Sequence, residues 1–318
     1  MSQRSSGQTG PVFLAGVDRS GIGLLGEVLE CHPDLSMTRR TNFWAFYADR
    51  LGALTSPAAV DRCIDEMMRN ARMRVLRPDR DRLHADFARG APTYARLFEQ
   101  LQLQLMQRRG CSRWGDKSLG AERFAESIFS AYPTASMVHV LRDPRDRHAA
   151  HANHRELRRR DAGRGAALWH WSERLARKHS RRFPGRYLVV RFEDLILEPG
   201  LALEGVREFL GLARPVGAME ASPLWTTSIG RHRQDLTPQE RRYLQLVLAR
   251  GMRRRGYAPD SLDLTAREEV SFWTRTLPVD SAKAAAWIAA NALRRERGRN
   301  PSDRRLEPIS EETVTPCE

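Results

Sequence analysis

The sequence predicts an α/β protein in which a central parallel sheet is covered by helices on both faces. Short apolar runs that suit buried strands recur along the chain, and segments with the spacing of helices separate them. The composition supports this class, because 41% hydrophobic and 29% charged residues are typical of a globular protein. A length of 318 residues allows one large core with a helical insertion.

The first predicted unit is a strand, a loop and a helix. Residues 11–16 (PVFLAG) form an apolar run that ends in glycine, and Ile22, Leu25 and Leu29 follow at helical spacing. A helical insert is expected from about 42 to 109, because prolines interrupt a helical periodicity there and no strand pattern is present.

The same order of strands and helices continues through the second half of the chain. We expect these elements at 112–117 (SRWGDK, strand), 121–131 (helix), 135–142 (ASMVHVLR, strand), 164–182 (helix), 186–195 (RYLVVRFEDL, strand) and 237–255 (helix). Strands that alternate with helices predict parallel pairing, with crossover helices above and below the sheet.

The two ends of the chain differ in composition from its middle. Residues 1–9 are a polar leader without the apolar core of a signal peptide, and residues 300–318 are a polar tail; both are predicted to be disordered. Residues 259–299 are expected to form a helical extension that ends in an alanine-rich helix with a basic end. Packing of this helix on the domain is the favoured interpretation, and weak contact with an anionic membrane surface is the alternative.

Charge and cysteine usage narrow the choice of partners and compartment. Lys and Arg outnumber Asp and Glu by 53 to 39, so the net charge of +14 favours nucleic acid, acidic lipid or a phosphorylated small molecule. Four scattered cysteines form no paired motif, and no run of about 18 apolar residues occurs. These features predict a cytoplasmic protein that needs no disulfide.

The segment GVDRSGIGLL (16–25) follows a predicted strand and opens a predicted helix, which is where backbone N–H groups converge on phosphates. Gly16 and Gly21 have the spacing of a nucleotide-binding loop. Ile22 and Gly23 replace its usual Lys and Ser/Thr, so no hydroxyl is placed for Mg²⁺. A P-loop nucleotide kinase is therefore a weaker alternative.

The order of several short motifs resembles the sulfotransferases that use 3′-phosphoadenosine 5′-phosphosulfate (PAPS). These motifs are GVDRSGIGLL, CHPDL, WGDK (114–117), HVLRDPRD (139–146), RYLVVRFEDL and SIGRHRQDLTP. The resemblance spans about residues 10–258 and implies a sulfotransferase domain over that range. It also implies a P-loop-like three-layer fold with a central parallel sheet, and sulfuryl transfer from PAPS without a metal.

The resemblance also implies roles for individual residues. Arg19 and Lys117 match the catalytic cations beside the phosphosulfate and the sulfuryl group, and Arg142 matches the arginine that binds the 3′-phosphate. The further cofactor-binding positions are Ser20, Gly21, Ile22, Gly23 and Leu24 in the first loop, Ala150 where a serine is usual, and Ser228, Gly230 and Arg231 in a late loop.

Other positions depart from the family pattern. Asp18 replaces the usual proline of the first loop, and Ile22 and Gly23 replace two threonines. Arg40 stands where many relatives have a glutamate base, and Leu119 where the cytosolic branch has a histidine. The remaining base candidates are Asp18, Asp116 and His148. A PAPS-binding protein with degenerate catalysis is therefore a second interpretation.

The acceptor is expected to be a small molecule, a carbohydrate or a lipid, and its identity and the oligomeric state are not readable from the sequence. Phe43, Trp44 and Tyr47 suit an acceptor pocket and a hydrophobic core equally. A metal site at His148, His151 and His154 is not expected, because their spacing spreads them around a helix. Nucleic acid is not an expected partner, since no DNA- or RNA-binding module is recognisable.

Overall fold

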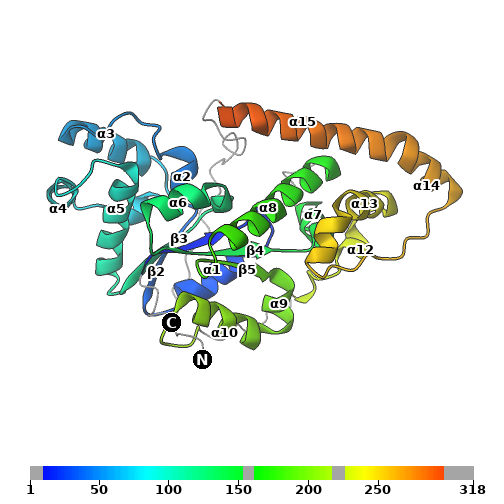
Figure 1. Ribbon diagram of the computed structural model, residues 1–318, viewed down its shortest axis with the longest axis horizontal. Helices are drawn as coiled ribbons and strands as arrows, with labels where there is room; N and C mark the ends of the chain where they lie inside the picture. The colour runs from blue at the N-terminus through cyan, green and yellow to red at the C-terminus, as the bar shows by residue number, and fades with distance from the viewer. Residues whose placement is uncertain (1–9, 153–160, 217–225, 297–318) are drawn as a thin grey trace.

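The computed structural model describes residues 10–152, 161–216 and 226–296, and its centre is a parallel five-stranded sheet (Figure 1). The strand order is β2-β3-β1-β4-β5, and every neighbouring pair is parallel. The strands are β1 (Val12–Ala15), β2 (Leu35–Arg39), β3 (Arg113–Lys117), β4 (Ser136–Leu141) and β5 (Tyr187–Arg191). Four of these lie in the predicted strand segments, whereas β2 was not predicted.

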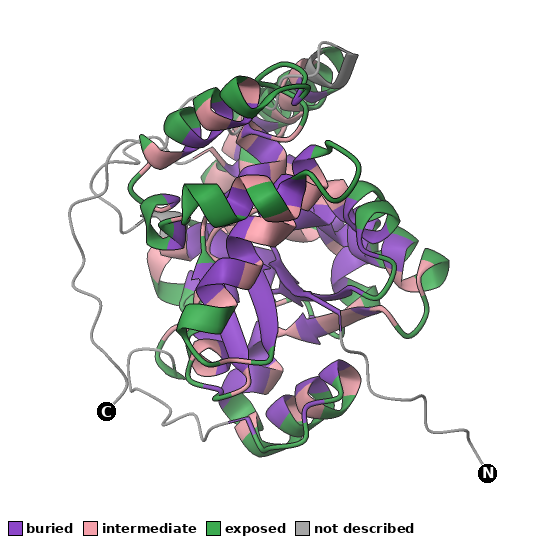
Figure 2. Cartoon of the chain, turned by 90° about the vertical axis from the view of Figure 1, so that its left-hand side faces the viewer, coloured by how far each residue is buried: buried purple, intermediate pink, exposed green. Residues whose placement is uncertain are grey.

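Alternating side chains of β1 show how the sheet separates two cores. Val12 and Leu14 pack under α1 (Ile22–Glu30), α9 (Phe192–Leu197) and α10 (Pro199–Leu210). Phe13 and Ala15 face the opposite core, which the helical insert and α6 supply. Figure 2 shows the buried strands between helices whose outer faces are exposed. The predicted three-layer α/β architecture is therefore confirmed.

Helices fill the insert between β2 and β3, as the sequence predicted. They are α2 (Phe43–Phe46), α3 (Pro57–Met68), the 3₁₀ turn η1 (Arg74–Leu76), α4 (Arg80–Phe87) and α5 (Tyr94–Arg108). Side-chain caps explain where three of them begin, because Ser56, Asp79 and Thr93 each accept a hydrogen bond from a first-turn N–H. The 3₁₀ turn η2 (Ala121–Phe124) and α6 (Ala125–Ala131) then connect β3 to β4.

A third core forms beside β5. Trp169, Tyr243 and Phe272 are buried in it, and it joins α7 (Pro144–Ala152), α8 (Ala162–Arg182), α12 (His232–Asp235) and α13 (Pro238–Arg254). Thr237 caps α13 in a capping box with Glu240, as the Thr-Pro start of the predicted helix suggested.

The C-terminal extension is helical and crosses α8 (Figure 1). It consists of α14 (Ala266–Ser271), the π-helical turn η3 (Phe272–Thr276) and α15 (Leu277–Glu296). Gly163 allows the close crossing, because a Cβ there would lie 1.9 Å from the carbonyl oxygen of Asp280. The division of the chain at residue 258 stays a prediction.

Two other expectations concern compartment and cysteine chemistry. Within residues 10–152, 161–216 and 226–296, no helix has both the length and the apolar character needed to cross a membrane. Cys63 and Cys111 are free thiols, and the expectation that the chain needs no disulfide stays a prediction. The predicted disorder of residues 1–9 and 300–318 falls outside the described residues.

The chain connections predict a ligand-binding crevice at the carboxyl ends of β1 and β4. From β1 the chain passes through α1 to β2 at one edge of the sheet, whereas from β4 it passes through α7 and α8 to β5 at the other edge. Open α/β sheets bind ligands where the connections of two adjacent strands diverge in this way. The loop after β1 and the turn after β4 therefore flank the expected binding site.

Candidate functional site

The loop from Gly16 to Gly21 turns tightly between β1 and α1. A Cβ on Gly16 would lie 2.8 Å from the carbonyl oxygen of Val140, and one on Gly21 would lie 2.2 Å from the ring of Phe192. Gly21 and Arg19 are also left-handed, with φ of 93° and 64°. Glycine is required at these two close approaches, whereas the left-handed Arg19 is a conformation that non-glycine residues rarely adopt.

The amino end of α1 is open to an anion. Gly21 is the N-cap residue and supplies no side-chain hydrogen bond, and no acidic residue stands in the first turn. Leu25 N–H is bonded to the Gly21 carbonyl at 3.4 Å, so the N–H groups of Ile22, Gly23 and Leu24 precede the helical hydrogen bonds. Such N–H groups and the positive end of the helix dipole together attract an oxyanion.

Arg142, at the end of β4, connects two of the predicted site loops. Its Nη1 donates to the carbonyl oxygen of Arg19 at 3.4 Å, and its Nη2 donates to that of Ser228 at 2.7 Å. The guanidinium carbon lies 4.5 Å from the centre of the Phe192 ring. Burial lowers the pKa of Arg142 from its usual value. The structure thus brings together three predicted residues that are far apart in sequence.

Asp146 holds the late loop against the turn that follows β4. Its carboxylate accepts the N–H groups of Gly230 at 2.7 Å and of His232 at 2.9 Å, and it contacts His232 Nδ1 at 2.5 Å. Burial alone would raise the pKa of Asp146, but the hydrogen bonds from His232 and Gly230 hold it below its usual range. Arg231 is half-exposed and its Nε donates to Asp235 at 2.6 Å.

Two buried charged side chains hold the backbone of the glycine loop. Arg147 Nε donates to the carbonyl oxygen of Asp18 at 3.0 Å, and the Glu122 carboxylate accepts the Gly16 N–H at 3.1 Å. Burial lowers the pKa of Arg147 to about 10. Sequence reasoning missed these two residues and Asp146. The cluster of charges in RDPRDR was the available signal for Asp146 and Arg147, and no signal marked Glu122.

Lys117 ends β3, where it pairs with Leu14 of β1. Its side chain runs beneath α1, with Nζ 3.5 Å from the position that a Cβ on Gly26 would take. No hydrogen bond or ion pair joins Nζ to another described residue. Burial lowers the pKa of Lys117 to about 8, and the neighbouring Arg39 and Arg40 add to this shift. Lys117 therefore lies at the same carboxyl end of the sheet as Arg19 and Arg142, but no described contact links it to them.

The surroundings of Asp116 indicate a structural role for this residue. Its carboxylate is buried and accepts hydrogen bonds from the hydroxyls of Thr38 and Thr41 at 2.8 Å and of Ser118 at 2.7 Å. Burial raises its pKa, although these three hydrogen bonds oppose the rise. A carboxylate with this set of donors organises the start of the insert and is poorly placed to accept a proton from a substrate.

The other two base candidates lie in different surroundings. His148 is buried in α7, and its Nε2 is 3.8 Å from a carboxylate oxygen of Glu240 on α13. Asp18 lies in the glycine loop, its side chain is 42% exposed, and its carboxylate is 3.8 Å from Arg19 Nε. Of the three candidates, Asp18 is the one on the loop itself that solvent reaches.

Several other residues singled out from the sequence lie in the hydrophobic core or on a helix. Phe43 and Tyr47 are buried in the core, and Phe43 stacks on Phe98 with ring centres 4.2 Å apart. Trp44 is partly buried against the same core. Ala150 is half-buried on α7. We therefore assign Phe43 and Tyr47 to the core.

The three histidines considered for a metal site are only partly covered by the structure. His148 and His151 lie in α7, whereas His154 lies outside the described residues. Among the residues that are described, no group of three or more His, Cys, Asp or Glu side chains could hold a metal ion.

The sheet order, the glycine loop and the helical insert define a P-loop-like α/β protein. The model of the sulfotransferase family matches residues 11–215, which is more than half of the chain. The chain therefore belongs to the sulfotransferase family. The match ends before the late loop at Ser228, so the family model does not cover that part of the site.

The fold is similar to that of a solved sulfotransferase domain, and further solved structures show weaker similarity. The sulfotransferase domain of the Synechococcus PCC 7002 olefin synthase is 20% identical, covers 83% of this chain and 100% of its own, and has a TM-score of 0.51. A sulfotransferase from Alicyclobacillus acidocaldarius is 18% identical, with coverages of 81% and 98% and a TM-score of 0.44. A mouse sulfotransferase solved with PAP is 11% identical, with coverages of 77% and 84% and a TM-score of 0.42. The search of curated proteins gave no match.

Proposed function

We propose that the chain transfers a sulfuryl group from PAPS to a hydroxyl or amine of a small molecule, carbohydrate or lipid. The observation that carries the proposal is a set of buried donors at the glycine loop. Arg19 Nε, Ser20 Oγ and Arg142 Nε are all buried without a hydrogen-bond partner. Buried polar groups normally have hydrogen-bond partners, so these three donors suit an anionic ligand, although Arg19 Nε also lies 3.8 Å from the Asp18 carboxylate.

The positions of these donors suit a ligand with two anionic ends. Arg19 and Ser20 follow β1 and Arg142 follows β4, so they lie on the two sides of the same crevice. The family resemblance assigns the 5′-phosphosulfate to Arg19 and the first-turn N–H groups of α1, and the 3′-phosphate to Arg142. Arginine suits both ends, because its planar group donates parallel hydrogen bonds to tetrahedral oxyanions.

Lys117 would neutralise the charge that develops on the departing phosphate oxygen during in-line displacement. A group with a pKa of about 8 is mostly protonated at neutral pH, so the required cation is present. Positioning by the loop and charge stabilisation by Arg19 and Lys117 would supply most of the rate, with no part assigned to a metal. The late loop, with Ser228 and Gly230, would cover the nucleotide. For Arg231 to contact the nucleotide as well, its ion pair with Asp235 would have to break.

The departures from the family pattern weaken the site without removing its charges. Ile22 and Gly23 supply no hydroxyl, and a neutral hydrogen bond contributes about 0.5–1.5 kcal/mol against about 1.5–3 for a charge-assisted one. Ala150 likewise adds no hydroxyl beside Arg142. The retained cations and N–H groups therefore account for most of the expected affinity.

The donor assignment is tested by ligand-induced stabilisation of the full chain. We expect 3′,5′-ADP at 100 times its dissociation constant to add about 2.7 kcal/mol to the free energy of unfolding. Arg142→Gln should lose most of this gain, whereas Arg186→Gln, at a partly buried arginine bound to the backbone carbonyls of Tyr132 and Ala135, should retain it. Stabilisation by ATP with Mg²⁺ but not by 3′,5′-ADP would favour the kinase alternative, and a response only to a DNA oligomer would also contradict the proposal.

We propose Asp18 as the general base, because Asp116 is saturated by hydroxyl donors and His148 faces Glu240. Loss of a general base typically lowers the rate by about 10²- to 10⁴-fold. Asp18→Asn should therefore reduce transfer from radiolabelled PAPS to 4-nitrophenol, glucosamine or octanol by a factor in this range. Asp263→Asn, at an exposed aspartate between α13 and α14, is the matched control.

The same assay separates an enzyme from a binding protein. Arg40 and Leu119 stand where relatives carry a base, and this observation favours degenerate catalysis. Binding of 3′,5′-ADP without transfer to any of the three acceptors would support that second interpretation. Full transfer by Asp18→Asn would exclude Asp18 as the base and leave the donor assignment intact.

A further inference from the structure

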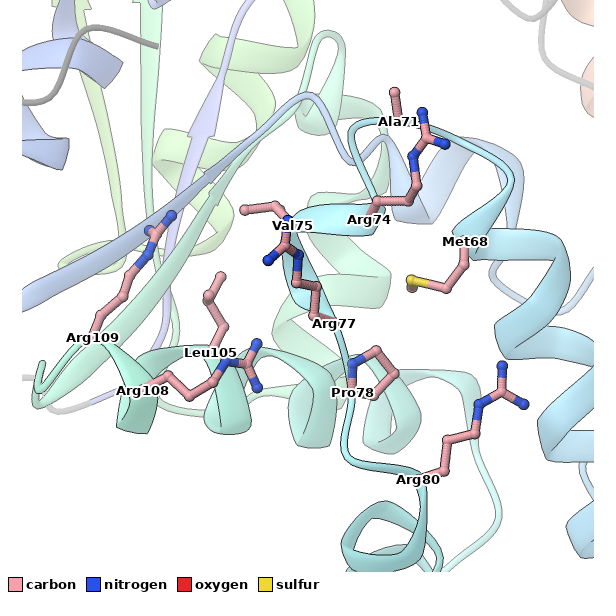
Figure 3. A pocket seen from close by; sticks show the side chains of 10 residues that line it. All are labelled: Met68, Ala71, Arg74, Val75, Arg77, Pro78, Arg80, Leu105, Arg108 and Arg109. Carbon is pink, nitrogen blue, oxygen red and sulfur yellow. The ribbon is translucent and has the colours of Figure 1, made fainter.

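A cavity of about 810 Å³ opens in the helical insert, outside the crevice described above. Its walls come from the end of α3, from η1 with the turn around it, and from the carboxyl end of α5 (Figure 3). None of Arg19, Lys117, Arg142 or Ser228 lines it. The Arg109 side chain also bonds to the edge of the sheet, since its Nη1 donates to the carbonyl oxygen of Met37 in β2 at 2.9 Å.

Half of the lining residues are arginines: Arg74, Arg77, Arg80, Arg108 and Arg109. Figure 3 shows that they come from two sides, with Arg74 and Arg77 on the η1 segment and Arg108 and Arg109 at the end of α5. The remaining lining residues are apolar and include Met68, Val75 and Leu105. No carboxylate is among the residues that line the cavity.

The positive charge of this arginine groove is mostly uncompensated. Arg80 alone is neutralised, by Asp61 at 3.2 Å and by Asp65. Arg108 and Arg109 donate to the carbonyl oxygens of Leu76 and Met37, which carry no net charge.

The guanidinium groups of Arg74 and Arg77 differ from those of the other three arginines. Neither Arg74 nor Arg77 forms a side-chain hydrogen bond or ion pair with another described residue. The groove therefore presents four cations, those of Arg74, Arg77, Arg108 and Arg109, that no acidic side chain of the described chain balances.

The clustered like charges affect Arg108 in particular, whereas Arg74 and Arg77 are exposed to solvent. Burial, and then the like charges of Arg109 and Arg77, lower the pKa of Arg108. Arg77 adopts a left-handed backbone with φ of 33°, a conformation that arginine rarely takes. Clustered like charges and backbone strain are more common at binding sites than in structural regions.

We propose that this arginine groove binds an anionic amphiphile, a small molecule with an aliphatic body and at least one phosphate, sulfate or carboxylate group. Guanidinium groups bind these oxyanions through paired hydrogen bonds, and Met68, Val75 and Leu105 provide aliphatic contact. The cavity volume lies within the range of about 300–1,000 Å³ that is usual for small-molecule sites.

The lining argues against nucleic acid as the ligand. Proteins that bind single-stranded nucleic acid combine basic grooves with aromatic side chains on which bases stack. No phenylalanine, tyrosine or tryptophan lines this groove. Aliphatic side chains beside guanidinium groups instead match a ligand whose apolar part is aliphatic.

The test is isothermal titration calorimetry of the full chain. The ligands differ in whether they carry an anionic group, an alkyl chain or both. Octyl phosphate should bind with one-to-one stoichiometry, pyrophosphate should bind more weakly, and 1,8-octanediol should not bind. Binding of octyl phosphate should also weaken as salt rises, because the attraction is between charges at the surface. Saturating 3′,5′-ADP should leave it unchanged, since no residue assigned to PAPS lines the groove.

Two matched pairs of substitutions decide the location of binding. Arg74→Gln with Arg77→Gln should weaken octyl phosphate binding by about tenfold or more, because charge-assisted hydrogen bonds are lost. Arg250→Gln with Arg253→Gln removes the same charge from the exposed face of α13 and should leave binding unchanged. The proposal would be overturned if the two double variants bound octyl phosphate with equal affinity. Binding to phosphatidylserine vesicles without binding to octyl phosphate would also overturn it. The readout needs no turnover, so its failure is distinct from failure of the proposed function.

Discussion

At the scale of the residue, Lys117 shows how a single side chain connects stability with the proposed function. The residue is 6% exposed, its ammonium group has no ion pair among the described residues, and burial lowers its pKa to about 8. Below pH 8 the folded protein must hold this charge, whereas the unfolded chain exposes it to water. The residue therefore destabilises the fold at neutral pH, which is a common feature of functional sites.

We expect Lys117→Met to stabilise the protein while it abolishes sulfuryl transfer. A pKa of about 8 against the usual 10.5 corresponds to about 3 kcal/mol, and this penalty applies in full below pH 8. The penalty decreases as pH rises from 8 toward 10.5, because the lysine then loses its proton in the folded state first. Urea unfolding should show a gain of up to ~3 kcal/mol at pH 7 and less than half of that at pH 9.5.

The transfer rate provides the second readout for this residue. Transfer that depends on the Lys117 cation should decline as pH rises through about 8. Lys117→Arg keeps a charged group at that pH, so any activity it retains should lack this decline. A stability gain from Lys117→Met that is no larger at pH 7 than at pH 9.5 would contradict the lowered pKa of Lys117. Full transfer by this variant would remove Lys117 from the mechanism.

At the scale of the element, α15 shows a helix with two different faces. Asp280 and Asn291 are buried on the side that packs on α8, and the ring of Trp287 lies 5.9 Å from that of Trp171. Val279, Ile288 and Leu293 are each more than half exposed at different points around the helix. Alanines occupy most of the positions between these three, so much of the exposed surface of the helix is apolar.

The alternative interpretation of this helix, weak membrane contact, can be tested with vesicles. Because the sequence reads RRERGR at 294–299 and the chain carries a charge of +14, this alternative predicts weak binding to vesicles that contain phosphatidylserine. Binding should fall at high salt and should be small for phosphatidylcholine alone. Co-sedimentation of the full chain with each type of vesicle measures both effects.

The control for this experiment uses a second exposed apolar pair. Ile288→Glu with Leu293→Glu should abolish the co-sedimentation. Leu197→Glu with Leu201→Glu changes the charge equally on α9 and α10, where the two leucines are 64% and 73% exposed, and should leave it unchanged. If both double variants lost co-sedimentation to the same extent, net charge alone would account for the binding.

At the scale of the whole molecule, the sheet divides the chain into regions with different tasks. The carboxyl ends of β1 and β4 carry the glycine loop and Arg142, which form the proposed PAPS site. The helical insert carries the arginine groove beside the edge strand β2. The helix α15 packs mainly on α8 (Figure 1). One parallel sheet thus supports two candidate anion sites and a separate helical surface.

The sequence determined the local structure well wherever the pattern of apolar residues is regular. Four strands, the glycine loop and the helical insert were predicted because spacing reports which side of an element is buried. The strand β2 was missed, since LSMTR contains little apolar sequence and its extended form depends on pairing with β3. The family was also readable from the order of short motifs.

Only the tertiary structure decided the surroundings of the side chains. It placed Arg142 between the carbonyls of Arg19 and Ser228, and it enclosed Asp116 among three hydroxyl groups that remove it from the list of bases. It also gathered the arginines of η1 and α5 around one cavity. The physical reason is that residue spacing encodes the local backbone, whereas charge, burial and hydrogen bonding depend on which distant segments the fold brings into contact.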